Sequence, residues 1–236
     1  MHDQRIVILG GTSGIGLAIA QRAAREGARV VVVSSTRTRV DAALAQLPGA
    51  EGDAVDLADA AAVAALFGRL GPFDHLAYTA GSPLTLAPLA SLDLAAARGF
   101  FELRYWAALA AVRHAVPRLR PGGSITLTGG TAALRPGAGW SLGASLCGAM
   151  EALTRALAVE LAPVRVNIVV PGLVDTELWS AMPAEARDTL FRTAAAALPV
   201  RRIGRPDDIA GAYLMFMASG YATGQRLVVD GGGVLV

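Results

Sequence analysis

Short apolar segments alternate with longer segments rich in Ala and Leu along this chain, and this alternation limits the fold more than any other feature. The apolar segments are Arg5–Leu9, Arg29–Val33, Leu76–Tyr78, Ile125–Thr128 and Val164–Val169, and the longest segments of helical character are Ala96–Leu119 and Ala144–Leu161. Continuously apolar strands are typical of a parallel sheet that is buried on both faces by crossover helices. The sequence therefore predicts an α/β fold with a Rossmann-like, doubly wound parallel sheet.

Composition narrows the range of functions. The 236 residues fit a single domain over 1–236, and the 21 basic and 19 acidic residues are scattered, so we expect neither a nucleic-acid surface nor a membrane patch. No lysine occurs, which excludes a Schiff-base lysine and a lysine acid or base. One cysteine, three histidines and an N-terminus without signal-peptide features predict a cytoplasmic protein with no disulfide and no metal site.

A glycine-rich turn directly follows the first predicted strand and precedes the predicted helix Leu17–Glu26. Glycines at such a turn allow the backbone to approach a pyrophosphate, whose charge is stabilised by the helix N-terminus. The alternative is a tight turn without a ligand. We expect nucleotide contacts from Gly10, Thr12, Ser13, Gly14, Ile15 and Gly16.

This turn resembles the G-x-x-x-G-x-G cofactor motif of the short-chain dehydrogenases/reductases, and other segments agree with that family in order and spacing. They are Asp56-Leu57, Tyr78-Thr79-Ala80-Gly81, Arg165-Val166-Asn167, Pro171-Gly172, Arg205-Pro206-Asp207-Asp208-Ile209-Ala210, Thr223-Gly224 and Asp230-Gly231-Gly232. The resemblance covers the whole chain. It implies cofactor contacts from Asp56 and Leu57 at the adenine, from Ala80 and Gly81, and from Pro171, Gly172, Val174 and Thr176 near the nicotinamide.

The end of the second predicted strand bears on the choice of cofactor. Members of the family that prefer NAD place an Asp there, whereas this chain has Ser34. The residues that follow, Ser35, Thr36 and Arg37, with Arg39 nearby, offer hydroxyls and guanidinium groups that suit a 2′-phosphate. We therefore expect NADP(H) rather than NAD(H), the alternative being a solvated loop that makes no cofactor contact.

The same resemblance implies that the catalytic residues of the family are replaced. Its Asn, Ser, Tyr and Lys positions align with Arg104, Gly130, Gly143 and Cys147. No tyrosine lies in the 130–150 segment, so no shift of the alignment restores the Tyr/Lys pair. A glycine in place of the tyrosine is expected to open the pocket floor for a larger ligand or for water, unless it is only a packing solution.

Several residues near that pocket are candidates for substrate contacts, namely Arg104, Thr131, Trp140 and Trp179. Arg104 suits a carboxylate or a developing negative charge, and its alternative is an ion pair with Glu102 on the helix surface. Cys147 fits a buried structural thiol better than a nucleophile. The segment Ala184–Ala197 is expected to form a helical cover, and the Ala-rich long helices suit a homodimer or homotetramer, although internal packing is an alternative.

Two functions remain open. The first is an NADP(H)-binding oxidoreductase of non-standard mechanism, which transfers hydride to a small organic acceptor, such as an iminium, a quinone or an activated enone, without a Tyr/Lys acid pair. The second is a catalytically silent cofactor-binding protein or a non-redox lyase, isomerase or cyclase on the same fold.

Overall fold

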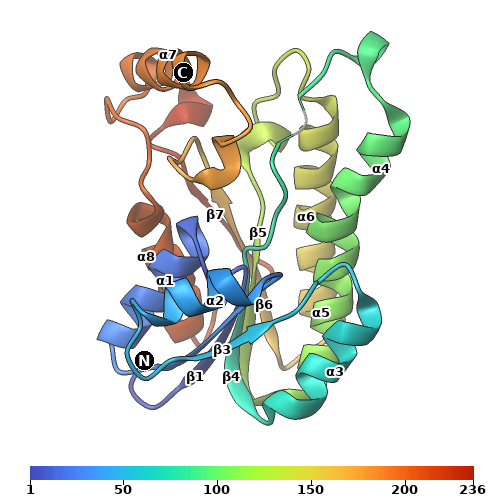
Figure 1. Ribbon diagram of the computed structural model, residues 1–236, viewed down its shortest axis with the longest axis vertical. Coiled ribbons are helices and arrows are strands. Elements are labelled where there is room, and N and C mark those ends of the chain that lie inside the picture. Colours follow the sequence, from blue (N-terminus) through green and yellow to red (C-terminus); the bar gives the residue numbers. More distant parts are fainter. Residues whose placement is uncertain (85) are drawn as a thin grey trace.

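A single seven-stranded sheet organises the chain, and helices cover both of its faces (Figure 1). The computed structural model describes residues 1–84 and 86–236. The strands are β1 (Arg5–Leu9), β2 (Arg29–Ser34), β3 (Glu51–Ala54), β4 (Phe73–Tyr78), β5 (Leu119–Thr128), β6 (Arg165–Pro171) and β7 (Arg226–Val229). The helices are α1 (Gly14–Arg25), α2 (Arg37–Leu44), α3 (Ala60–Leu70), α4 (Leu94–Phe101), α5 (Ala107–Ala115), α6 (Ser141–Glu160), α7 (Ala184–Ala197) and α8 (Pro206–Ala218).

The strand order is β3-β2-β1-β4-β5-β6-β7, and every adjacent pair is parallel. The order reverses direction between β1 and β4, as in a doubly wound sheet. The central strands are buried along nearly their whole length, which explains their continuous runs of Val and Ile. The predicted fold class is therefore confirmed.

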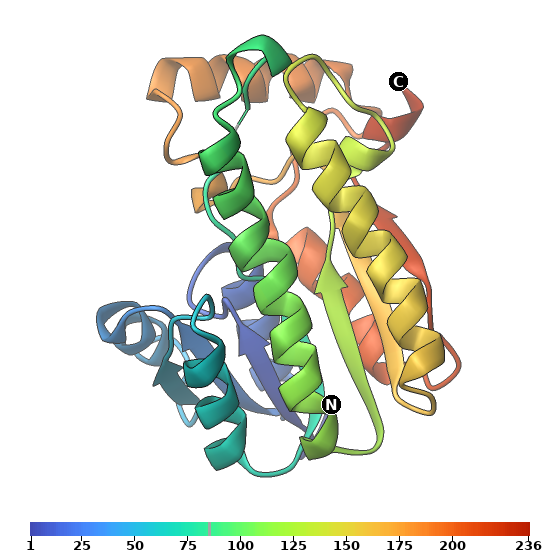
Figure 2. The same ribbon diagram turned by 90° about the vertical axis from the view of Figure 1, so that its right-hand side faces the viewer.

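Two hydrophobic clusters lie on opposite faces of the sheet. Alternate residues of each strand feed them: Val7 and Leu9 of β1 join the cluster beneath α3, α5 and α6, whereas Ile6 and Ile8 join the cluster beneath α1 and α8. Figure 2 shows the α4–α5 segment and α6 side by side over one face. By length and composition α6 is apolar enough to cross a membrane, but it packs against β6 and buries Leu146, Met150 and Leu157 in the first cluster.

The predicted helix Ala96–Leu119 is wrong as one continuous element. The helical segment begins earlier, where the Asp93 carboxylate accepts from the Ala95 amide at 2.8 Å as an N-cap, and a π-helical turn over Glu102–Trp106 separates α4 from α5. A short 3₁₀ turn over Val116–Arg118 then leads into β5, which starts at Leu119. The interruption matters because Arg104 lies within the π-helical turn, and such turns often occur at functional sites.

Candidate functional site

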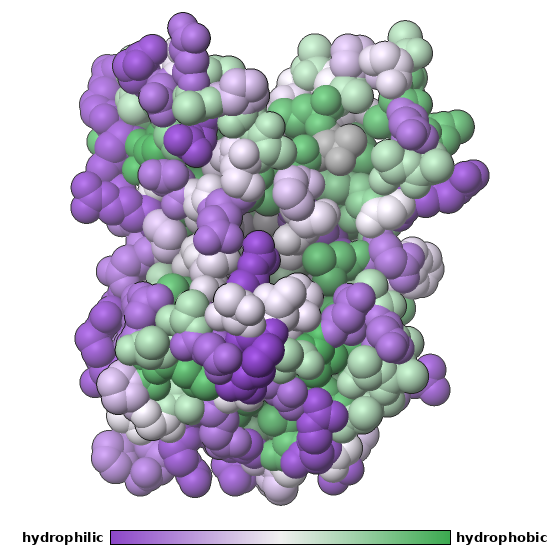
Figure 3. Space-filling model, in the orientation of Figure 1, coloured by the Kyte–Doolittle hydropathy of each residue, from purple (hydrophilic) through white to green (hydrophobic). Residues whose placement is uncertain are grey.

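One large pocket opens at the carboxyl ends of the strands. Its volume is about 480 Å³, within the range of small-molecule sites, and its lining includes residues at or just after the ends of β1, β2, β4, β5 and β6. Figure 3 shows the surface hollowed between the part that carries α7 and the part that carries α4 and α6. The position agrees with the rule that open α/β sheets bind ligands where the strand order reverses.

Nearly all residues that the sequence assigns to a site lie in this one pocket. They are Gly10, Thr12, Ser13, Gly14, Ile15, Gly16, Ser34, Ser35, Asp56, Leu57, Ala80, Gly81, Arg104, Thr131, Gly130, Trp140, Gly143, Cys147, Pro171, Gly172, Val174, Thr176 and Trp179. Thr36 and Arg37 do not line it. The Thr36 hydroxyl caps α2, and Arg37, the first residue of that helix, forms an ion pair with Asp41 at 2.5 Å. Arg39, two residues further along α2, lines the pocket instead.

The glycine turn holds the start of α1 close to the sheet. A Cβ atom at Gly16 would lie 2.1 Å from the carbonyl oxygen of Gly10, so no other residue fits there. The Ser13 side chain makes no capping hydrogen bond, and the first turn of α1 therefore presents its amide groups to the pocket without a side-chain cap. This arrangement fits a pyrophosphate.

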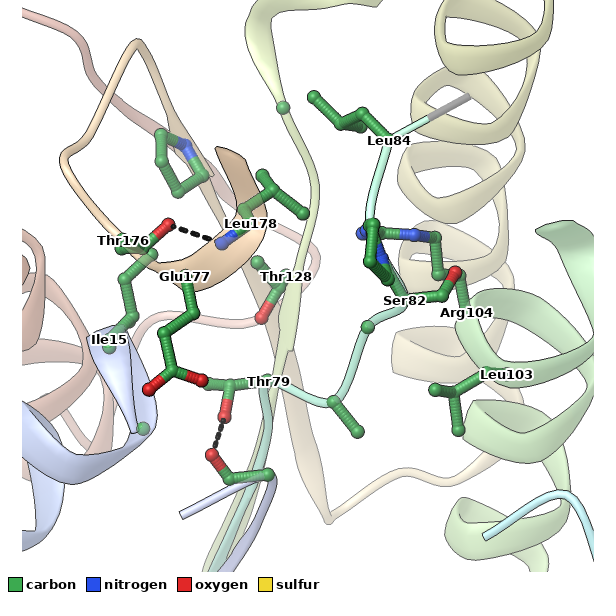
Figure 4. Close-up of a pocket in the computed structure, with 18 of the residues that line it drawn as sticks. Ile15, Thr79, Ser82, Leu84, Leu103, Arg104, Thr128, Thr176, Glu177 and Leu178 are labelled. Atoms are coloured by element: carbon green, nitrogen blue, oxygen red, sulfur yellow. Dashed lines mark hydrogen bonds between the residues drawn. The ribbon is translucent and has the colours of Figure 1, made fainter. Parts of the chain in front are cut away.

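The opposite wall comes from the loop after β6. Gly172 packs so closely on Asp230 that an added Cβ would lie 2.6 Å from the Asp230 Cβ, which anchors the loop on the C-terminal segment. Thr176 caps a short 3₁₀ turn by accepting from the Leu178 amide at 3.3 Å, and its side chain also faces Gly14 (Figure 4). The glycine turn and this loop therefore form the two sides of one cleft.

Arg104 reaches into the pocket from the π-helical turn. Figure 4 shows its side chain extending toward Ser82, whose carbonyl oxygen accepts from Nη2, and its guanidinium lies 5.0 Å from the centre of the Phe100 ring. Burial lowers the pKa of this guanidinium from its ordinary value. Within the described residues no carboxylate lies within 4.0 Å, so the alternative ion pair with Glu102 is not formed.

The pocket floor is built from Gly130, Gly143 and Cys147. Burial raises the pKa of the Cys147 thiol to about 11, against the opposing effect of the Arg104 charge, so the thiol is neutral near pH 7. A Cβ atom at Gly143 would meet only Trp140, at 3.9 Å, which leaves room for a side chain. A second cavity of about 50 Å³ adjoins the floor and shares Arg104, Thr128 and Cys147 with the main pocket.

Two hydroxyl groups beside the pocket floor already donate their protons to carbonyl oxygens of the protein. Tyr78, which borders the small cavity, donates its hydroxyl proton to the Leu103 carbonyl oxygen, and burial raises its pKa above the ordinary value. The Thr128 hydroxyl lies 2.5 Å from the Tyr78 carbonyl oxygen and 2.5 Å from the Tyr213 hydroxyl. Because the carbonyl can only accept, Thr128 donates to it and Tyr213 donates to Thr128. Neither Tyr78 nor Thr128 has a free proton to offer a ligand.

The two aromatic candidates both lie in the pocket, whereas a third tryptophan lies at the surface. Trp140 and Trp179 line the pocket, and Trp179 donates from Nε1 to the Val174 carbonyl oxygen at 3.0 Å. Trp106, by contrast, is 54% exposed and lies outside the lining. The α7 helix matches Ala184–Ala197, and its Phe191 packs edge-on against Trp179 at 6.3 Å.

Glu177 is a pocket residue that sequence reasoning missed. It lies across the cleft from Arg104 and its side chain extends toward Thr79 (Figure 4). In the sequence, a single glutamate after a threonine looks like any solvent-exposed loop residue, so no sequence pattern marks Glu177 as a site residue. The structure finds it only because the 3₁₀ turn over Glu177–Trp179 lies above the cleft.

Comparison with known proteins agrees with this geometry. A family model described as enoyl-(acyl carrier protein) reductase matches residues 10–233. A short-chain dehydrogenase/reductase of Stachybotrys chlorohalonatus is 37% identical over 100% of this chain and 98% of its own. The cis-4-hydroxycyclohexanecarboxylate dehydrogenase of Sinomonas cyclohexanicum is 35% identical, with 96% of this chain and 94% of its own covered.

Two solved structures are also similar. A small-chain dehydrogenase crystallised with NADPH has a TM-score of 0.88 and 36% identity, covering 99% of this chain and 100% of its own. The MalC reductase/Diels-Alderase of Malbranchea aurantiaca has a TM-score of 0.91 and 30% identity, covering 100% of this chain and 98% of its own. With its parallel sheet, its glycine turn and relatives that match it from end to end, the chain belongs to the short-chain dehydrogenase/reductase family of oxidoreductases.

Proposed function

We propose that this protein is an NADP(H)-dependent oxidoreductase that reduces a small organic acceptor without a Tyr/Lys acid pair. One observation carries the proposal: a single pocket joins the glycine turn and Ser34, Ser35 and Arg39 to a compartment around Arg104, Gly143 and Cys147. The NADPH complex of a relative 36% identical in sequence supports the choice of cofactor. When bound, the cofactor would supply a hydride at the nicotinamide end.

The residues present fit this cofactor. The first turn of α1 would hold the pyrophosphate, and the hydroxyls of Ser34 and Ser35 with the guanidinium of Arg39 would hold a 2′-phosphate. Pro171, Gly172, Val174 and Thr176 would border the nicotinamide. Asp56 and Leu57, which line the same pocket, would border the adenine.

The class of hydride acceptor follows from the lack of a proton donor among the described residues of the pocket floor. The chain has no lysine, the Cys147 thiol holds its proton up to about pH 11, and no tyrosine is found among the described residues that line the main pocket. Hydride addition to an iminium carbon gives a neutral amine and needs no proton. Addition to a quinone or an activated enone gives a hydroquinone anion or an enolate, which water then protonates. These acceptors match the pocket better than a simple ketone, whose alkoxide needs an acid at once.

A non-redox reaction in the same pocket is the second candidate. The relative from Malbranchea aurantiaca is named as both a reductase and a Diels-Alderase, and the open floor beside Gly143 would admit a bulky cyclising substrate. In that case the bound cofactor would be a structural element, and no hydride would leave it.

The first experiment is a fluorescence titration of the purified protein with NADPH and, separately, with NADH. Micromolar binding of NADPH with weaker binding of NADH supports the proposal, and absence of binding by either rejects it. A panel of iminium, quinone, enone and ketone acceptors is then incubated with stereospecifically deuterated NADPH. If NADPH binds and no acceptor gains deuterium, the non-redox candidate replaces the redox one.

A gain-of-function variant tests whether the protein lost only the catalytic side chains of the family or whether its pocket also no longer positions a ketone. The combination Gly130→Ser, Gly143→Tyr and Cys147→Lys restores the family residues at three aligned positions, and a Cβ atom at position 143 would meet only Trp140, at 3.9 Å. Ketone reduction by this variant, measured as NADPH oxidation, is the expected result. Its absence in a folded variant that binds NADPH would mean that the pocket no longer places a ketone beside the cofactor.

A further inference from the structure

Among the described residues, the guanidinium of Arg104 has fewer hydrogen-bond acceptors than it has N–H donors. The Ser82 carbonyl oxygen accepts from Nη2, and the Phe100 ring lies below the charge, yet the buried Nε finds no acceptor in the described part of the chain. Across those same residues no Asp or Glu approaches to ion-pair distance. A guanidinium has five N–H donors, and among the described residues only one of those of Arg104 has an acceptor, although its side chain lines both the pocket and the adjoining cavity.

A partly buried cation without a counter-charge destabilises the fold. Removing a charge from water is costly, and arginine cannot escape that cost by losing its proton near neutral pH. Arg165, which is 8% exposed, shows how the fold satisfies another buried arginine. Arg165 donates to the carbonyl oxygens of Phe216 and Met217, at 2.6 and 3.0 Å. Arg104 lacks such a set, and the missing acceptors would come from a ligand.

We propose that Arg104 is an anion subsite, which binds the carboxylate of an organic acid beside the floor of the pocket. The inference rests on the proposed function in one respect, namely that the acid is the substrate of the same site. The pocket that Arg104 lines also has apolar side chains, namely Phe100 under the guanidinium and Leu84, Leu103, Trp140 and Leu146 elsewhere in the lining. A ligand that matches them carries one carboxylate on a hydrophobic body, and the forked guanidinium favours a carboxylate by bidentate hydrogen bonding.

The phosphates of the cofactor are the other source of negative charge in this pocket. They have their own sites, at the first turn of α1 and at Arg39, whereas Arg104 shares the small cavity with Cys147, Thr128 and Met150. A carboxylate on the substrate is therefore the partner that the arrangement favours, and the test below includes the cofactor as a separate arm.

The experiment compares matched acids and amides. Benzoate, phenylacetate, cyclohexanecarboxylate and hexanoate are each titrated against their neutral amides by calorimetry at saturating NADPH, with tryptophan fluorescence as a second signal. At least one acid is expected to bind about 10- to 100-fold more tightly than its amide, the range for hydrogen bonds to a charged group. Arg104→Met should abolish this preference, Arg104→Lys should retain part of it, and Arg113→Met, an exposed arginine on α5, should leave it unchanged.

Thermal unfolding and NADPH affinity complete the test. If Arg104 serves a ligand rather than the fold, Arg104→Met keeps or raises the melting temperature, since it removes an unpaired charge. The inference is overturned if no acid in the panel is preferred over its amide, if the preference survives in Arg104→Met, or if that variant loses NADPH instead. Failure of NADPH to bind the unaltered protein, with acids still preferred when measured without it, would reject the oxidoreductase proposal and leave the anion subsite standing.

Discussion

Gly130 and Cys147 touch across the floor of the pocket: a Cβ atom placed at Gly130 would lie 3.1 Å from the Cys147 sulfur. The backbone of Gly130 is extended, with φ −174°, a conformation that any residue adopts. The thiol alone therefore limits what can stand at position 130. The two residues are coupled, and a change at either alters the space available to the other.

A double-mutant cycle measures this coupling. Gly130→Ala is expected to lower the free energy of unfolding by about 1 kcal/mol, because the new methyl group presses on the sulfur. In a Cys147→Ala background the same substitution should cost much less, since the contact is relieved. Urea unfolding of the four proteins gives the coupling, and an equal cost in both backgrounds would contradict the contact.

Arg39, and not Arg37, is expected to select NADPH over NADH. Arg39→Ala should weaken NADPH binding about tenfold while leaving NADH affinity unchanged, because one charged hydrogen bond to the 2′-phosphate is lost. Arg37→Ala is the matched control, since that side chain pairs with Asp41 outside the pocket. Fluorescence titration with both nucleotides checks the prediction, which fails if Arg37→Ala has the larger effect.

Gly81 keeps space open for the Arg104 guanidinium. A Cβ atom there would lie 2.8 Å from Nη1, so Gly81→Ala should push the guanidinium aside and reduce the preference for acids over amides several-fold. The melting temperature should change little, because a flexible side-chain end yields to the methyl group. Gly99→Ala in α4, where an added Cβ meets nothing within 4 Å, is the control. An unchanged acid preference in Gly81→Ala would argue against the position of Arg104 described above.

His75 makes stability depend on pH. It is buried in β4 and bonded through Nδ1 to the Ser124 hydroxyl at 2.9 Å, and burial, with the nearby Arg165 charge, lowers its pKa to about 4. The unfolded chain has the ordinary value near 6.5, so between these pH values the unfolded state binds more protons. Above pH ~6.5 the titration of His75 does not lower the free energy of unfolding. As the pH drops from there to about 4, this titration lowers the free energy of unfolding by about 3 kcal/mol.

Urea unfolding from pH 7 to pH 4 tests this dependence. In His75→Gln the loss of stability over that range should be smaller by a similar amount, because no group titrates at that position. Parallel curves for the two proteins would mean that other groups control the acid sensitivity. The site lies away from the pocket, so NADPH affinity at pH 7 should not change in the variant.

The fold was predictable because its signals are local and strong. Val30 to Val33 and Ile6 to Leu9 are continuously apolar, and only a strand buried on both faces uses such runs. The glycine turn was equally informative, since Gly16 has no room for a side chain. The predicted strand Arg5–Leu9 matches β1, whereas β4 and β5 begin earlier than predicted, at Phe73 and Leu119, and β3 and β7 were not predicted. Most candidate residues line one pocket.

Other features needed coordinates because they depend on packing between distant elements. The sequence does not show that Arg37 pairs with Asp41 one turn along α2 and lies outside the pocket lining. The open donors of Arg104 reflect the lack of a carboxylate within 4.0 Å among the described residues, and no property of Ala96–Leu119 reveals that. The π-helical turn is also invisible in a segment of good helix formers.

The direction in which Arg104 points depends on the number of residues in the π-helical turn. A π-helical turn holds one more residue than an α-helical turn, and each residue of an α-helix advances the chain by about 100° around the axis. Deleting Tyr105 or Trp106, neither of which lines the main pocket, would let the helix close regularly and rotate α4 against α5, so that a different side chain would face the pocket. Pocket chemistry in this protein can therefore change through a deletion that alters none of the residues lining the pocket.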